Sequence, residues 1–221
     1  MARVVPAFPL NTVVFPGMSV PLHVFEDRYR ALVSHLLQEP DPAARVFATV
    51  AIRDGYEVGE HGAQSLYRVG CLLQLTEVEA DPDGTFEIVA VARERIRIEA
   101  MVPDHEFPSV RIVDVPDSDE ETSEEALVRA RAAFTAYRAA LAQMQGDPFS
   151  GRLPRDPGYL SWALAAAAPL PLSEKQQVLE AEDPAVRLEI VTSMLRDELR
   201  AINVIPSMPA VQVARTSWSP N

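Results

Sequence analysis

The chain contains very little lysine or cysteine: among its 221 residues, Lys175 is the only lysine and Cys71 the only cysteine. A single cysteine excludes an intrachain disulfide, and its apolar neighbours predict a buried, unreactive thiol. A phosphate-binding P-loop places a lysine after a glycine-rich turn, whereas Lys175 lies between Glu174 and Gln176, so the sequence contains no P-loop. A hydrolytic Ser–Lys dyad would also have to use Lys175, but its neighbour Ser173 is better explained as a helix cap.

Histidine is also scarce, and the four histidines show no metal-ligand spacing such as His-Glu-x-x-His. His23 alternates with apolar residues, so we expect it to be a hydrogen-bonded structural histidine. The sequence contains no Gly-x-Ser-x-Gly elbow. We therefore predict no catalytic residue, no cofactor and no metal site. A hydrolase built from acids that only folding brings together remains an alternative.

Basic residues are outnumbered by acidic ones, 20 against 32, which gives a net charge of −12. The excess is spread along the chain, with −7 in residues 1–116 (10 bases, 17 acids) and −5 in residues 117–221 (10 bases, 15 acids). Binding of nucleic acids and anionic lipids relies on basic residues, so this charge argues against both partners. The start of the chain lacks the apolar core of a secretory signal, and we expect a cytoplasmic protein.

Residues 1–116 are predicted to be mainly β-structure. Apolar and β-branched runs at 46–52 and 71–78 predict strands, and the second leads through an Asp-Pro-Asp-Gly turn into 86–91 as a hairpin. Residues 96–100 and 110–115 alternate between apolar and polar, as strands with one wet face do. One helix is predicted to begin at Glu26 and end before Pro40. Its apolar stripe comprises Tyr29, Leu32, Val33, Leu36 and Leu37.

The second half changes to a helical period after an acidic linker at 117–122. Residues 123–203 are predicted to form helices, and the prolines in 204–221 predict a tail. Strands followed by helices indicate an α+β protein with segregated layers and two domains, at 1–116 and 123–203.

Helix starts in this half carry local capping signals. Asp156 and Asp183 each precede a proline, the pattern of an N-cap followed by the first helical residue. Thr122 and Glu125 predict a capping box for a long helix that stops at Gly146. Ser173 is expected to cap a short helix between the helices that begin at Asp156 and Asp183.

Residues 8–29 form the most unusual segment, with three prolines among apolar residues. Proline removes a hydrogen-bond donor from a β-ladder, so this segment is predicted to lie at the edge of a sheet. Residues 9–18 (PLNTVVFPGM) and 21–29 (PLHVFEDRY) resemble the opening of the Lon protease N-terminal, substrate-binding domain family, especially its free-standing bacterial versions. Shorter matches at 67–71, 92–96 and 175–188 extend the resemblance to about residue 203.

The resemblance implies a PUA-like β-barrel followed by a helical bundle, with a role in recognising unfolded or tagged polypeptides and in oligomer assembly. It also implies that the ATPase and Ser–Lys peptidase modules of full Lon proteases are absent from these 221 residues, and that the chain is a non-catalytic module, such as an adaptor in protein quality control. RNA binding, which PUA-like folds often show, is an alternative that the charge disfavours. A homodimer remains open.

Within the segment at 8–29, three apolar residues are candidates for polypeptide contact, because exposed apolar patches mark interaction sites. These candidates are Phe15, Met18 and Phe25. The alternative is that they close the barrel. Five further residues of the family motif are expected to be structural, namely Pro16, Gly17, Glu26, Arg28 and Tyr29.

Overall fold

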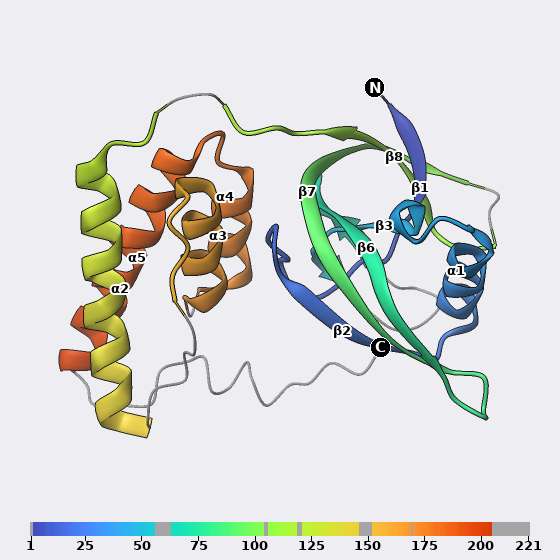
Figure 1. Ribbon diagram of the computed structural model, residues 1–221, viewed down its shortest axis with the longest axis horizontal. Helices are drawn as coiled ribbons and strands as arrows, with labels where there is room; N and C mark the ends of the chain where they lie inside the picture. Colours follow the sequence, from blue (N-terminus) through green and yellow to red (C-terminus); the bar gives the residue numbers. More distant parts are fainter. Residues whose placement is uncertain are drawn as a thin grey trace. The chain divides into compact units, whose positions relative to one another are not determined.

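The computed structural model describes residues 2–55, 63–103, 106–118, 121–145, 152–168 and 170–204. The chain forms two compact units that divide between Pro116 and Asp117. Figure 1 shows strands and one α-helix in the first unit and α-helices in the second. Among the described residues, no helix combines the length and the apolar content that crossing a bilayer would require.

In its described residues, the first unit contains eight strands, one α-helix and one 3-10 helix. They are β1 (Arg3–Pro6), β2 (Ser19–Val24), α1 (Asp27–Gln38), the 3-10 helix η1 (Pro42–Ala44), β3 (Val46–Thr49), β4 (Ile52–Gly55), β5 (Ala63–Leu66), β6 (Val69–Ala80), β7 (Phe86–Val102) and β8 (Ser109–Asp114). The main sheet is antiparallel, in the order β1-β8-β7-β6-β3, and β2 pairs with β7 beside this path.

The sheet does not close into the barrel that the resemblance implied. Its two ends approach each other only through isolated bridges from Ala7 to Ala48 and from Leu10 to Ala51, so no continuous ladder joins β1 to β3. The curved sheet still encloses an apolar core. Members of this core are Val5, Ala7, Ala48, Val50, Leu72, Ile96, Ile98, Val110 and Ile112.

Strand β7 is longer than the sequence pattern suggested, because it joins the two predicted strands at 86–91 and 96–100. Alternation breaks at Arg93 and Glu94, where the pairing with β6 shifts register at a bulge. A bulge inserts an extra residue without ending the strand. The first half of β7 pairs with β2 and its second half pairs with β8, and Figure 1 shows that β7 is strongly curved.

The second unit contains α2 (Glu124–Gln145), α3 (Pro157–Ala167), α4 (Leu172–Glu180) and α5 (Pro184–Val204). Helix α5 packs against each of the other three. Leu188, Val191 and Leu195, spaced by three and four residues, are buried along one face of α5.

Two of the predicted helix caps are confirmed and two are wrong. Asp156 accepts a hydrogen bond from Tyr159 N at 2.9 Å, and Asp183 accepts one from Val186 N at 2.8 Å.

For α2, the hydroxyl that accepts from Ala126 N at 3.2 Å belongs to Ser123, so Thr122 is not the cap. Ser173 lies inside α4, because this helix already begins at Leu172. For α2, local sequence did not distinguish between the neighbouring candidates Thr122 and Ser123. Helix α4 instead follows Pro171, which makes no side-chain cap hydrogen bond. Gly146 lies outside the described residues.

Candidate functional site

The proline-rich segment of the first unit contributes β2 and the turn before it. Strand β2 has β7 as its one ladder partner among the described strands, as expected for a proline-containing edge strand. Pro21 lies in the middle of β2 and has no N–H to donate. A polypeptide strand that added to this edge would lack one backbone hydrogen bond, so contact through side chains is favoured here.

The three polypeptide-contact candidates do not form one surface. Phe15 is fully buried, so its ring presents nothing to a ligand in this structure. Met18 is half-buried, and its sulfur accepts a hydrogen bond from Phe15 N at 3.2 Å, which stabilises the turn at Gly17, where φ is 88°. Phe25 is half-buried at the other end of β2, about 20 Å away along a strand of this length.

The motif residues Glu26, Arg28 and Tyr29 meet at the start of α1. Arg28 pairs with Glu26 at 2.9 Å and lies over the Tyr29 ring, with its guanidinium carbon 4.6 Å from the ring centroid. The Tyr29 ring stacks on Phe8 at 4.0 Å, which anchors α1 to the sheet core. These contacts join the start of α1 to the sheet core, and the structural role of the three residues stays a prediction. Pro16, half-buried, precedes the turn at Gly17.

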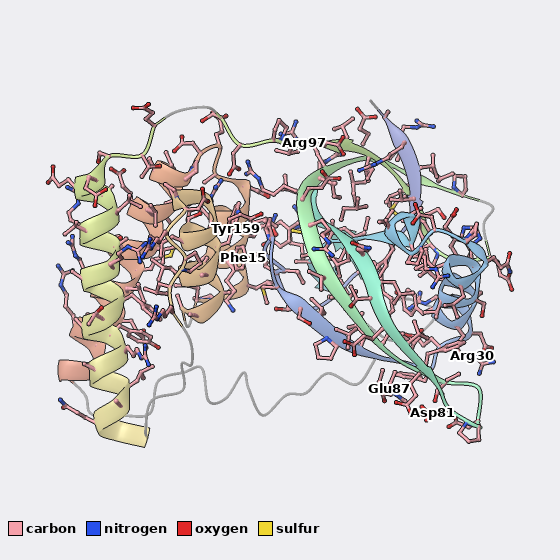
Figure 2. All side chains as sticks on the ribbon, in the orientation of Figure 1. Phe15, Arg30, Asp81, Glu87, Arg97 and Tyr159 are labelled. Atoms are coloured by element: carbon pink, nitrogen blue, oxygen red, sulfur yellow. The ribbon has the colours of Figure 1, made fainter. Side chains whose placement is uncertain are left out.

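His23 belongs to a small polar cluster near the turn between β6 and β7. It lies directly opposite Glu87 in the β2–β7 ladder, and its Nδ1 is 2.6 Å from Glu87 Oε1. Asp81 brings a further carboxylate, so that ligand atoms of the three residues lie within 4.8 Å of one another. Figure 2 shows Asp81 and Glu87 close together at this turn. These residues could hold a metal ion, but the hydrogen bond to Glu87 already gives His23 the structural role expected of it.

Two titratable side chains of this unit have perturbed pKa values for local reasons. Burial raises the pKa of the Cys71 thiol well above its ordinary value, and the sulfur donates to Val14 O at 3.1 Å. Hydrogen bonds from Thr85 lower the pKa of Asp83 in the turn after β6. The buried thiol is inaccessible to a substrate, and the lowered pKa makes the Asp83 carboxylate a weaker base than a free one.

A buried arginine organises the second unit, and no sequence pattern predicted its burial. Arg187 of α5 is fully buried and forms a two-bond ion pair with Asp117, at 2.9 and 2.5 Å. Its Nε donates to Ser161 Oγ at 2.9 Å, and its guanidinium lies 3.7 Å from the Trp162 ring centroid. Asp117, which the sequence assigned to an acidic linker, therefore belongs to the packing of the helical unit.

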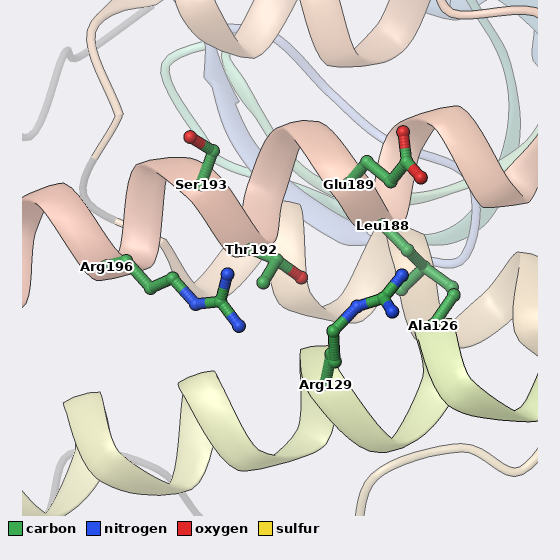
Figure 3. Close-up of a pocket in the computed structure, with 7 residues that line it drawn as sticks. All are labelled: Ala126, Arg129, Leu188, Glu189, Thr192, Ser193 and Arg196. Atoms are coloured by element: carbon green, nitrogen blue, oxygen red, sulfur yellow. The ribbon is translucent and has the colours of Figure 1, made fainter.

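The described residues of the second unit line hollows at its surface. One, of about 470 Å³, is lined by acidic and small residues that include Asp117, Asp156 and Gly158. Another, of about 230 Å³, lies between α2 and α5 and is lined by Ala126, Arg129, Leu188, Glu189, Thr192, Ser193 and Arg196. Figure 3 shows this second hollow, a groove with arginines from both helices. It was missed in the sequence because Arg129 and Arg196 are far apart there and neither belongs to a motif.

Comparison with solved structures gives the class of protein that this fold defines. The structure is similar to the Lon N-terminal domain protein from Xanthomonas campestris, with a TM-score of 0.64 and 23% identity, covering 86% of this chain and 98% of that one. It is also similar to the N-terminal domain of a Mycobacterium avium complex Lon protease, with a TM-score of 0.63 and 19% identity, covering 88% and 99%. The fold is therefore that of a Lon N-terminal domain, mixed α/β with an antiparallel sheet.

Sequence comparison then identifies the family. The model of the ATP-dependent protease La (LON) substrate-binding domain matches residues 4–197, and the chain belongs to this family. It is 27% identical over 204 residues to the Lon protease of Escherichia coli K12, covering 90% of this chain and 25% of that protein. It is 30% identical over 201 residues to Lon protease 1 of Syntrophobacter fumaroxidans, covering 89% and 24%. The chain thus spans about a quarter of the length of these relatives.

Proposed function

We propose that this protein is a non-catalytic module that binds polypeptide segments, and that it acts as an adaptor for protein degradation. The observation that carries the proposal is the family match, which runs through both units from residue 4 to residue 197. The setting of Cys71 and of the titratable groups near β2 is in keeping with binding rather than bond cleavage. A PUA-like origin of the first unit and a bundle arrangement of the four helices are part of the same proposal.

The proposed apolar contacts in the first unit are Met18 and Phe25, the two candidates that keep exposed surface. Phe15, which is fully buried, supports them from the core instead. Since the two lie at opposite ends of β2, each is expected to contact a different part of an extended polypeptide. Burial of the apolar side chains of an unfolded polypeptide against such residues lowers the free energy, whereas a folded protein keeps its apolar side chains in its own core.

Binding is tested with the purified chain and a fluorescently labelled, permanently unfolded polypeptide, measured by anisotropy without nucleotide. We expect saturable binding, for which the unlabelled unfolded polypeptide competes and a folded protein of similar length does not. Substitutions M18S and F25A should each weaken binding several-fold, whereas V4S, at an exposed valine of β1 in the same unit, should not. Absence of saturable binding, or equal loss in all three variants, would contradict the proposal.

The adaptor role needs a separate measurement. The chain should change the rate at which an ATP-dependent protease degrades the same unfolded polypeptide, and F25A should reduce this effect. If binding occurs but degradation by every protease tested is unaffected, the adaptor role is wrong while polypeptide binding stands.

A further inference from the structure

The groove between α2 and α5 concentrates positive charge on an acidic protein. Arg129 reaches into it from α2 and Arg196 from α5, and Figure 3 shows the two guanidinium groups on either side of Thr192. Glu189 and Ser193 also line the hollow, but Figure 3 shows their polar ends directed to the other side of α5. Two cations facing one space repel each other until an anion lies between them.

Both guanidinium groups keep hydrogen-bond donors for a ligand. Arg129 Nη1 binds Glu125 Oε1 at 2.6 Å, and the other N–H donors among its five remain for a ligand. Arg196 is exposed and forms no ion pair with any residue in the described part of the chain. A fork of planar N–H donors matches the two oxygens of a carboxylate.

The floor of the groove suits a ligand with an apolar stem. Leu188 and Ala126 are buried beneath it, with 1% and 6% of their surfaces exposed, and the largely buried Thr192 adds a hydroxyl between the arginines. At about 230 Å³, the groove has room for more than a carboxylate alone. A glutamate side chain on an extended polypeptide fits this space, with its carboxylate between the guanidinium groups.

We infer that the α2–α5 groove binds a carboxylate of an acidic segment in the polypeptide and so gives the protein a preference for such segments. The inference rests on the proposed function and names part of its substrate class. The net charge of −12 repels acidic ligands at long range, so any preference for them must come from local contacts. Tighter binding of acidic peptides than of neutral ones would therefore indicate binding at the groove.

The test uses three labelled peptides of equal length and apolar content, carrying glutamate, glutamine or phosphoserine at the same positions. Binding to the full chain is measured by anisotropy. We expect the glutamate peptide to bind about fivefold to tenfold more tightly than the glutamine peptide, as charge-assisted hydrogen bonds are stronger than neutral ones. R129Q and R196Q should each reduce this preference, and the double variant should abolish it without changing the affinity for the glutamine peptide.

A matched control separates the groove from general charge. R200Q removes the same charge one helical turn beyond Arg196, where Arg200 pairs with Asp197 at 2.6 Å, and should leave the preference within about twofold. T192V, which keeps the shape and removes the hydroxyl, should reduce the preference about twofold to threefold.

Three results would overturn the inference: equal binding of glutamate and glutamine peptides, a preference that survives in the double variant, or binding of the phosphoserine peptide alone. Equal binding leaves the proposed function intact, whereas failure of every peptide to bind removes both.

Discussion

Replacement of Asp117 by asparagine should destabilise the helical unit strongly, although the sequence places this residue in a linker. Arg187 is fully buried, and its two bonds to Asp117 are the charge-neutralising contacts of the guanidinium. D117N keeps the shape and an oxygen acceptor but removes the negative charge, which leaves a buried cation without its counterion. Removal of one partner of a buried pair costs about 3–5 kcal/mol.

The expected magnitude lies at the lower end of that range, because the Asp117 side chain keeps 34% of its surface exposed and water offsets part of the loss. A loss of about 3 kcal/mol in a unit of about 100 residues lowers its unfolding midpoint by roughly 12–24 °C. Trp162, on which Arg187 stacks, reports unfolding of this unit by fluorescence, with Trp218 replaced by phenylalanine so that the signal has one source. Circular dichroism at 222 nm gives an independent trace of the helices.

A comparison with an exposed ion pair and a double variant make the prediction decisive. R200Q removes one partner of an exposed pair and should change stability by less than about 0.5 kcal/mol. D117N/R187M removes both charges of the buried pair, so its loss should be smaller than the sum of the two single losses. If D117N melts within about 2 °C of R200Q, the ion pair does not stabilise the unit and the reasoning is refuted.

Three further predictions concern single residues. A Cβ at Gly70 would lie 2.0 Å from Thr49 O, so G70A should lower the free energy of unfolding by about 3 kcal/mol. G84A should lower it by only about 1 kcal/mol, because a Cβ at Gly84 meets no atom and the cost comes from its φ of 86°. Cys71, whose thiol pKa is raised by burial, should react with a thiol reagent at pH 8 only at the rate of unfolding, and fast labelling in native buffer would contradict its burial. Burial, with a smaller effect from a neighbouring carboxylate, raises the pKa of Glu198, so the folded chain holds this proton more tightly than the unfolded chain. Ionisation of Glu198 therefore costs stability at pH 7 but not below its ordinary pKa of about 4.3, and E198Q should raise the melting temperature slightly at pH 7 and leave it unchanged near pH 3.5.

Local structure could be predicted from the sequence wherever neighbouring residues alone determine it. The caps at Asp156 and Asp183 depend on a carboxylate and an N–H three residues later, and both formed as predicted. The stripe of α1 was buried at Tyr29, Leu32, Val33 and Leu36, while Leu37, at its margin, stayed 38% exposed. Burial of Cys71 followed from its apolar neighbours.

The candidate site was less predictable, because its residues meet only through long-range packing. Phe15 has the same apolar character as Met18 and Phe25, yet only the fold placed it in the core. The break in alternation at Arg93 suggested two strands, whereas the ladder with β6 carried β7 through it as a bulge.

By itself, the sequence determined the family, the change from strands to helices and the absence of a P-loop, because these follow from local order and motif. The tertiary structure decided the rest. It joined Asp117 to Arg187 across 70 positions of the chain, left the sheet open between β1 and β3, and brought Arg129 and Arg196 to one groove. The physical reason is the same in each case: ion pairs, ladder ends and grooves depend on distances in space, which helix and strand periods do not fix.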